Sequence, residues 1–265
     1  MDKISLVYLC GGMSSRFGGQ IKQFAKVGPN DETLIQVSLD QALKQPFHEI
    51  VFIVSSKTQV PFMELFGDSY KNVPIKYCKQ EYDIFLRDRP WGTADAFSYL
   101  KKYINNSFII CNGDDLYGET TFKLCFERLL NEKCNIAMSY PLHTLLPETG
   151  KVNRGVFTVD FDNRIVGIDE LLDISSDMLD ETQLGLNASV NFMGLNKNVI
   201  DLVYDENVKF IDKYTGDRKI EHLLPLALND LIQDNKMEMF CMTSPDKCIG
   251  VTKQEDVEYV RSMLK

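Results

Sequence analysis

The sequence comprises 265 residues with a mass of 30.3 kDa, and 44% of them are hydrophobic, which is enough to bury a substantial core. A formal net charge of −9 at pH 7 argues against a nucleic-acid partner or an anionic membrane surface, because both require a basic protein surface. The cysteines number seven and are widely spaced, so we expect free thiols in a reducing compartment, the cytoplasm, with neither a signal peptide nor a membrane span in the sequence.

The first functional signal is an apolar run at residues 4–10 that ends abruptly in a loop rich in glycine and cationic residues. This pattern predicts a buried strand followed by a phosphate-binding loop, because glycines let backbone N–H groups approach a ligand while cations neutralise its charge. The loop residues that carry the pattern are Gly11, Gly12, Arg16, Gly18, Gly19, Lys22 and Lys26. The pattern alone does not distinguish among phosphate chemistries.

Strands and helices alternate through residue 140. Apolar spacing predicts helices at 33–45, 59–66, 93–104 and 120–131, and short apolar runs predict strands at 49–54, 75–79, 107–111 and 135–140. A strand, a helix and a second strand form a βαβ unit, and such units build parallel sheets. We therefore predict an α/β fold with a central, mostly parallel sheet flanked by helices.

The pattern changes after Pro141. Two short runs, 156–161 and 164–169, flank an Asp162-Asn163 turn signal and predict an antiparallel hairpin. The other expected elements are a polar loop at 174–183, a strand at 186–195, a helix that begins at 199, a helix at 221–233, a strand at 238–242 and a helix at 254–264. The prediction is a single domain over 1–265, in which the second half, 141–265, adds a smaller mixed β region over one edge of the parallel sheet of 1–140.

Polar clusters fall where predicted strands end, and the ligands of open parallel sheets bind at the carboxyl ends of the strands. Asp114 and Asp115 follow the strand at 107–111, and such a pair of carboxylates can hold Mg²⁺ or can cap a helix. Gln80 begins a loop that feeds a helix N-terminus, which suits an anion or a base edge. The same loop also contains Arg87, Arg89, Trp91, Gly92 and Thr93. A further polar cluster consists of Lys219 and Glu221.

Several of these residues also have a purely structural interpretation. Trp91 alone is more typical of packing than of base stacking, and Lys219 with Glu221 is typical of a solvated pair at the start of a helix. His222 and the two other histidines have no metal-binding spacing, so we expect them to be structural or at the surface. No Ser-His-Asp or Cys-His set can be argued from spacing.

Taken in order, the motifs resemble the sugar-1-phosphate nucleotidyltransferases, also called nucleoside-diphosphate-sugar pyrophosphorylases. The motifs are LCGGMSSRFGG with Lys22, then PWGTADAF, then NGDDLYG, then a lysine and a glutamate before LLP. The resemblance runs from Leu6 to about Val257 and looks closest to the compact bacterial-type subgroup with a GGxGSRYGGLKQ loop. It implies a Rossmann-like sheet of the glycosyltransferase-A type and a reaction, with Mg²⁺, that joins a nucleoside triphosphate to a sugar 1-phosphate and releases pyrophosphate.

The resemblance also implies roles for individual residues in two halves of the chain. In the nucleotide-binding half, 1–140, it implies nucleotide contacts from Leu9, Gly11 and Gly12, triphosphate binding by Arg16, stabilisation of the leaving pyrophosphate by Lys22, base contacts from Gln80, Gly92 and Thr93, and Mg²⁺ binding by Asp114. In the sugar-phosphate-binding half, 141–265, it implies that Gly155, Glu170 and Asn191 face the sugar and that Lys219 approaches its phosphate. Catalysis then comes from alignment and charge neutralisation, with no protein nucleophile.

The sequence departs from the family pattern in two places. Gly250 stands where many members have a second metal-binding aspartate, which leaves Asp115 or the substrate phosphates to complete the metal shell. The opening loop is one residue longer than in the family, so both Lys22 and Lys26 are candidates for the phosphate-binding lysine, and we favour Lys22.

The resulting expectation is a cytoplasmic, Mg²⁺-dependent enzyme that uses UTP with glucose 1-phosphate or N-acetylglucosamine 1-phosphate. One alternative is a CTP-dependent cytidylyltransferase that acts on a non-sugar phosphate, such as a polyol phosphate or phosphocholine. The other is a nucleotide-sensing module without turnover, which the missing late aspartate motivates. The sequence leaves the oligomeric state open, a homo-oligomer included.

Overall fold

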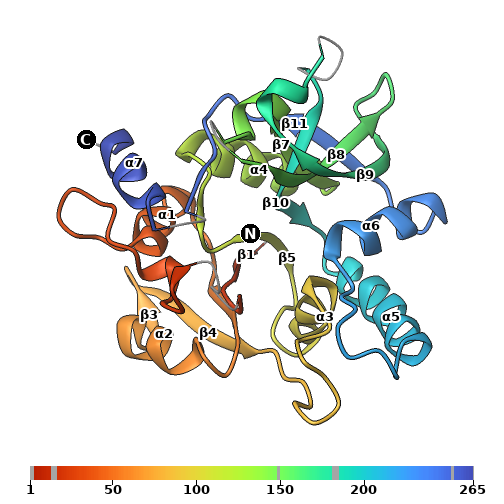
Figure 1. The fold of residues 1–265 in the computed structure, drawn as a ribbon, viewed down its shortest axis with the longest axis horizontal. Coiled ribbons are helices and arrows are strands. Elements are labelled where there is room, and N and C mark those ends of the chain that lie inside the picture. Colours follow the sequence, from red (N-terminus) through yellow and green to blue (C-terminus); the bar gives the residue numbers. More distant parts are fainter. Residues whose placement is uncertain (1–2, 13–16, 148–149, 181–184, 252–253, 265) are drawn as a thin grey trace.

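The apolar runs assemble into one central sheet in the computed structural model, which describes residues 3–12, 17–147, 150–180, 185–251 and 254–264. The strands of this sheet are β1 (Ile4–Leu9), β2 (Ile50–Val54), β3 (Ser69–Tyr70), β4 (Val73–Lys79), β5 (Ser107–Asn112), β7 (Asn135–Pro141), β8 (Val152–Val159), β9 (Ile165–Ile174), β10 (Asn187–Leu195) and β11 (Met239–Thr243). Their order is β11-β7-β10-β5-β1-β2-β4-β3, with the β8-β9 hairpin attached to β10 (Figure 1). Two short strands, β6 (Asp115–Leu116) and β12 (Ile249–Gly250), pair separately.

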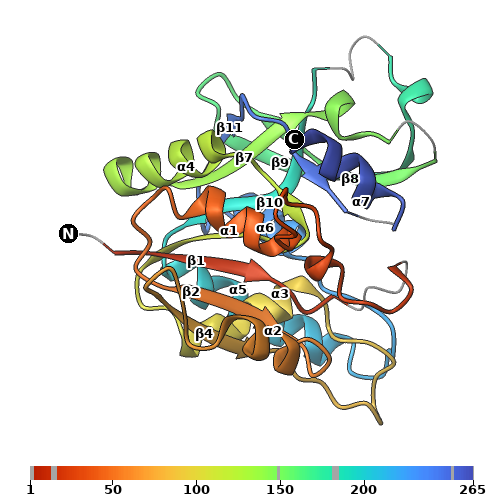
Figure 2. The same ribbon diagram turned by 90° about the vertical axis from the view of Figure 1, so that its left-hand side faces the viewer.

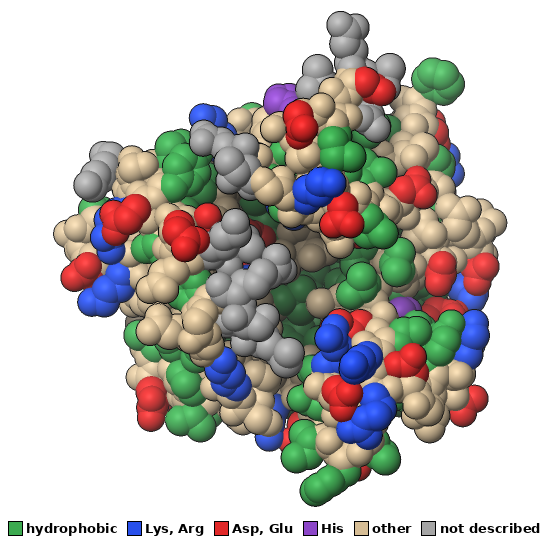
Figure 3. Space-filling view, viewed as in Figure 1, with side chains coloured by type: hydrophobic (Ala, Val, Ile, Leu, Met, Phe, Trp, Pro, Cys, Tyr) green, Lys and Arg blue, Asp and Glu red, His purple; other side chains and the backbone are tan. Residues whose placement is uncertain are grey.

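The first half of the chain forms the predicted parallel arrangement. β1 pairs in parallel with β2 and with β5, and β2 pairs in parallel with β4. Figure 2 shows β1, β2 and β4 running side by side. Their carboxyl ends therefore meet at one face of the molecule, which Figure 3 shows hollowed near its middle.

The second half is arranged differently from the prediction. β10 lies between β5 and β7 and is antiparallel to both, so the second half supplies a strand to the middle of the sheet. The expectation of a β region that only covers one edge is wrong in this respect. The predicted hairpin is confirmed, because β8 and β9 pair in antiparallel register around Asp162 and Asn163.

The helices follow the predicted order. They are α1 (Leu34–Ala42), α2 (Gln59–Phe66), α3 (Thr93–Ser98), α4 (Glu119–Glu132), α5 (Asn198–Lys213), α6 (Leu224–Gln233) and α7 (Asp256–Met263). α1 begins where it does because Thr33 and Gln36 form a reciprocal capping box. Among the described residues, no helix is both long enough and apolar enough to cross a membrane.

Two segments differ from the expected elements. The helix predicted at 93–104 is α3 followed by a 3₁₀ turn at Tyr99–Lys102. The predicted loop at 174–183 begins inside β9 and contains a short 3₁₀ helix at Ser176–Met178, while residues 181–183 lie outside the described residues.

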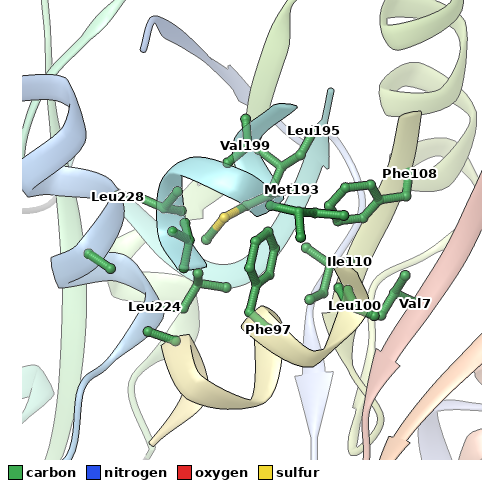
Figure 4. Packing of buried hydrophobic residues seen from close by; sticks show 14 of the residues in the cluster. Val7, Phe97, Leu100, Phe108, Ile110, Met193, Leu195, Val199, Leu224 and Leu228 are labelled. Carbon is green, nitrogen blue, oxygen red and sulfur yellow. The ribbon is translucent and has the colours of Figure 1, made fainter. Parts of the chain in front are cut away.

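The core lies in two layers, one on each face of the sheet, because successive strand residues point to opposite faces. Val7 packs with α3, α5 and α6, whereas Leu6 and Tyr8 pack with α1, α2 and α4. Figure 4 shows the first layer, in which Phe97 and Leu224 meet the sheet residues. Each fully buried side chain of this size contributes roughly 1.5–3 kcal/mol.

The cysteines match the expectation of free thiols. All seven are unpaired, and five of them are buried, namely Cys10, Cys78, Cys111, Cys125 and Cys241. Burial raises the pKa of the buried thiols, which makes them poor nucleophiles at neutral pH.

Candidate active site

The segments that follow the parallel strands lie side by side at the hollowed face. Leu9 pairs with Asn112, and the N–H of Gly113 donates to the carbonyl of Leu9 at 3.0 Å. The N–H of Gln80 donates to the carbonyl of Val54 at 2.9 Å. The opening loop, the loop that begins at Gln80 and the Asp114-Asp115 pair therefore meet at one edge of the sheet, as the position of ligands in open parallel sheets predicts.

Lys22 and Asp114 form an ion pair at this edge. Lys22 Nζ contacts Asp114 Oδ2, and the two side chains are only 22% and 20% exposed. Gly113 permits this approach, because a Cβ at that position would lie 2.6 Å from Cys10 Sγ and 3.3 Å from the carbonyl of Leu9. A larger residue at 113 would push Asp114 away from Lys22.

Lys26, the alternative phosphate-binding lysine, has a different partner and is more exposed. Lys26 is paired at 3.6 Å with Asp31, and its side chain is 61% exposed. The two lysines thus differ sharply in burial and in partner, and this difference supports the choice of Lys22 over Lys26 as the phosphate-binding lysine.

Asp115, next to the Lys22–Asp114 ion pair in the sequence, is hydrogen-bonded to other polar side chains. Its Oδ2 accepts hydrogen bonds from Asn112 Nδ2 at 3.0 Å and from the Tyr117 hydroxyl at 3.3 Å. Burial, together with the charge of Asp114, raises the pKa of Asp115. The interpretation of the aspartate pair as a helix cap is wrong, since α4 is preceded by Gly118 at its N-cap.

Gly250 packs directly against Asp115. The short strands β12 and β6 place Gly250 opposite Asp115, and a Cβ at position 250 would collide with Asp115 Oδ1. Asp115 therefore fills the space next to Asp114 that a side chain at position 250 would need.

The candidate nucleotide-binding residues of the first half gather around Gln80. An ideal Cβ on Gly11 would lie 3.9 Å from Gln80 Oε1, and Gln80 Nε2 donates to the carbonyl of Gly92 at 3.0 Å. Gly92 has a φ of 106°, and a side chain there would collide with the backbone of His222. Gly12 is exposed beside Gly11, whereas Arg16 lies outside the described residues.

Thr93 has a structural partner. Its hydroxyl oxygen accepts a hydrogen bond from the N–H of Leu224 at 2.8 Å, at the start of α6. The hydroxyl thus ties the loop after Gln80 to the second half of the chain.

The arginines of that loop have protein partners. Arg87 is 3% exposed, donates to the carbonyl of Asp217 at 2.5 Å, and stacks on the Trp91 ring with its guanidinium carbon 3.5 Å from the centroid. Arg89 forms an ion pair with Glu221 at 2.9 Å. Both arginines therefore hold the loop, and Trp91 is a packing residue, as its structural interpretation predicted.

The candidate sugar-binding residues line the β8-β9-β10 side. Gly155 is paired with Glu170, and a Cβ on Gly155 would lie 3.5 Å from Glu170 Oε2. Asn191 adopts a φ of 55° at a bulge in β10 and directs its Nδ2 toward Asn112 Oδ1 at 3.5 Å. Burial raises the pKa of the Glu170 carboxyl.

Lys219 is not in contact with these residues. Its side chain is exposed, and its ammonium group makes no ion pair or hydrogen bond within the part of the chain that the structure describes. Only its backbone is fixed, because its N–H donates to Asp217 Oδ1 at 2.7 Å.

Two further polar residues of the site were not predicted. Asn112 links Asp115 to Asn191, and the NGDD motif could have indicated it. Arg154 lies close enough to Asp115 and Glu170 for its positive charge to lower the pKa of both carboxyls, partly offsetting the effect of burial. An isolated arginine in a strand gives no sequence signal of this kind.

Comparison with known proteins identifies the class to which this arrangement belongs. The model of the nucleotidyl transferase family matches residues 9–170, which is more than half of the chain. The chain therefore belongs to the nucleotidyl transferase family. No curated protein matches it in sequence.

Solved structures share the fold over nearly the whole chain. The inositol-1-phosphate CTP transferase from T. maritima has a TM-score of 0.68 at 16% identity, with 100% of this chain and 97% of that chain covered. A UDP-glucose pyrophosphorylase complexed with UDP-glucose has a TM-score of 0.69 at 13% identity, with 99% and 98% covered. HddC from Yersinia pseudotuberculosis complexed with GMP-PN has a TM-score of 0.65 at 16% identity, with 99% and 100% covered. The chain thus has the Rossmann-like nucleotidyltransferase fold, and these structures carry three different nucleotide bases in their names.

Proposed function

We propose that the protein joins UTP to a sugar 1-phosphate, either glucose 1-phosphate or N-acetylglucosamine 1-phosphate, and releases pyrophosphate. The observation that carries the proposal is the Lys22–Asp114 pair at the carboxyl ends of β1 and β5, next to the glycine loop. A cation and a carboxylate at this edge suit a triphosphate and its counterion. The match to the nucleotidyl transferase family supports the same reaction class.

Lys22 has the position to act on the leaving group. Its ammonium group pairs with Asp114, and its side chain is only 22% exposed, so its charge is less screened than that of a fully exposed lysine. There it would neutralise the negative charge that develops as pyrophosphate leaves. The sugar phosphate oxygen attacks the α-phosphorus in line, the bond to the β-phosphate oxygen breaks, and Arg16 and Gly12 help to align the triphosphate.

The donor atoms near Asp114 fit Mg²⁺. Asp114, Asp115 and Asn112 offer oxygen atoms, and no group of three or more His, Cys, Asp or Glu residues within the described ranges is placed to hold a metal. Mg²⁺ commonly takes one or two protein carboxylates and completes its shell with phosphate oxygens and water. We propose Asp114 as its ligand and Asp115 as the second carboxylate. When bound, Mg²⁺ would neutralise charge on the phosphate oxygens.

The acceptor would bind on the other side of the pair. We propose that Gly155, Glu170 and Asn191 face the sugar and that Lys219 approaches its phosphate from an exposed position. In this proposal residues 1–140 form the nucleotide-binding half and residues 141–265 the acceptor-binding half of one domain of the compact subgroup. Arg154 adds a cation between Glu170 and Asp115, which suits an anionic acceptor.

Transfer from CTP to a non-sugar phosphate is the second candidate. The fold similarity to the inositol-1-phosphate CTP transferase supports it, and the anionic acceptor would use the same side of the site. The nucleotide-sensing alternative is less favoured, because Asp115 places a carboxylate beside the position that the missing aspartate leaves.

A panel of substrates tests the proposal. Pyrophosphate release is measured for UTP, dTTP, CTP, GTP and ATP, each with glucose 1-phosphate, N-acetylglucosamine 1-phosphate, a polyol phosphate and phosphocholine. We expect release with UTP and a sugar 1-phosphate. Release only with CTP and a non-sugar phosphate would favour the second candidate. Tight nucleotide binding without pyrophosphate release from any pair would refute the proposal that the protein is an enzyme.

A further inference from the structure

The amide of Gln80 is held in one orientation by two acceptors. Gln80 Nε2 donates to the carbonyl of Gly92 at 3.0 Å and to Asp95 Oδ2 at 2.8 Å. A carbonyl and a carboxylate accept hydrogen bonds and cannot donate them, so both groups require the nitrogen end of the amide. If the amide were turned by 180°, its oxygen would face two other oxygens. Gln80 is 8% exposed, which makes this orientation costly to change.

A chain of buried polar groups fixes Asp95 in turn. Asn207 Nδ2 donates to Asp95 Oδ1 at 3.1 Å, and Asn207 Oδ1 lies 3.1 Å from His222 Nδ1. Because the Asn207 nitrogen is used by Asp95, its oxygen must face the histidine, and His222 Nδ1 must carry the proton. His222 is stacked on Phe210 with the ring centroids 4.2 Å apart and the planes 6° apart. The direction of every hydrogen bond in this chain is therefore determined.

The consequence appears at the other end of the Gln80 amide. Gln80 Oε1 accepts no hydrogen bond from the described residues, and it lies on the side of Gly11, where an ideal Cβ would be 3.9 Å away. The site thus presents a fixed acceptor, with no donor beside it on the same amide. The residues that impose this are Asp95 of α3, Asn207 of α5 and His222 before α6.

We propose that Asp95, Asn207 and His222 are positioning residues that hold Gln80 as a hydrogen-bond acceptor and thereby select bases that carry a ring N–H. This inference rests on the proposed function, in which the nucleotide base lies against Gln80. Uracil and thymine have an N–H at N3 and guanine has one at N1, whereas cytosine N3 and adenine N1 are acceptors. An acceptor placed against an acceptor leaves both unpaired, and that penalty gives the discrimination.

Nucleotide binding to the full chain tests the inference without an acceptor substrate. Calorimetric titrations with UTP, GTP, CTP and ATP give the ratios of their dissociation constants. We expect UTP or GTP to bind more tightly than CTP by roughly 10- to 100-fold, the range that one unpaired buried polar group implies. Asp95→Ala should reduce this ratio, because only the Gly92 carbonyl then holds the nitrogen end of the amide.

A double exchange is the matched control. In Asp95→Asn combined with Asn207→Asp, the amide introduced at position 95 can accept from Gln80 through its oxygen and can donate through its nitrogen to the carboxylate introduced at position 207. That carboxylate can still accept from His222. Gln80 and His222 therefore keep their donor roles in these hydrogen bonds, so the preference against CTP should return. Gln80→Met keeps the length of the side chain without the amide and should lose the preference even if Asp95→Ala does not fold.

The outcomes separate this inference from the proposed function. Equal affinity of the wild-type protein for UTP and CTP overturns the inference alone. A uniform loss of affinity for all four nucleotides in Asp95→Ala, with the ratios unchanged, shows a merely structural role and also overturns it. Failure of the wild-type protein to bind any nucleotide overturns the proposed function and the inference together.

Discussion

Replacing Lys22 with alanine should abolish most of the turnover while leaving the fold intact. The Lys22 side chain is only 22% exposed, and its ammonium group lies against Asp114 at the carboxyl ends of β1 and β5. A preorganised group that stabilises charge in the transition state contributes about 10²- to 10³-fold in kcat, which corresponds to about 3–4 kcal/mol. We therefore expect a loss of this size for Lys22→Ala.

Lys26→Ala is the matched control for this variant. Lys26 is 61% exposed and its pair with Asp31 spans 3.6 Å, so its removal should change stability by about 1 kcal/mol or less. The assay is steady-state pyrophosphate release at saturating Mg²⁺ and UTP, with circular dichroism to confirm folding. A larger loss in Lys26→Ala than in Lys22→Ala would refute the reasoning from burial and would transfer the role to Lys26.

Three further substitutions test the metal site and the loop. Asp114→Ala should lose Mg²⁺-dependent turnover and stay folded, and an unchanged rate would move the metal ligand elsewhere. Gly250→Ala should displace Asp115 and raise the Mg²⁺ concentration needed for half-maximal turnover by roughly tenfold; an unaltered Mg²⁺ titration would remove Asp115 from the metal shell. Gly92→Ala should lower the free energy of unfolding by about 1–3 kcal/mol, because its φ of 106° and the nearby His222 backbone exclude a side chain. A denaturant titration that shows no change would contradict this last prediction.

The fold could be predicted as far as it depends on local patterns. The apolar runs locate β1, β2 and β5, because burial on both faces leaves a continuous apolar run. The helical spacing gives α2 its observed bounds. The position of β10 could not be predicted in this way. Its insertion between β5 and β7 depends on pairing between strands far apart in the chain, which periodicity within one strand does not specify.

The candidate site likewise contains residues that the sequence indicates and residues whose contacts it does not indicate. Lys22, Asp114 and the Gln80–Gly92 loop carry short motifs, so the sequence indicates that they belong to one edge of the sheet. Arg87 and Lys219 show the limit of this reasoning, because one cation turns inward to backbone carbonyls and the other stays exposed.

The hydrogen-bonded polar residues that hold Gln80 could not be predicted from the sequence. Asp95, Asn207 and His222 come from three separate segments, and none of them has a neighbour in sequence that marks it as polar core. Only the packing of α3 against α5, and of both against the segment before α6, brings these side chains together.

The most direct test of the central claim follows the α-phosphate of the nucleotide. UTP labelled with ³²P at the α-phosphate is incubated with the protein, Mg²⁺ and glucose 1-phosphate or N-acetylglucosamine 1-phosphate, and the products are separated. The account predicts that the label enters a UDP-sugar in step with the release of unlabelled pyrophosphate, and that chelation of Mg²⁺ stops both. Label that remains in UTP with every phosphorylated acceptor tested, despite measurable binding of UTP, would contradict it.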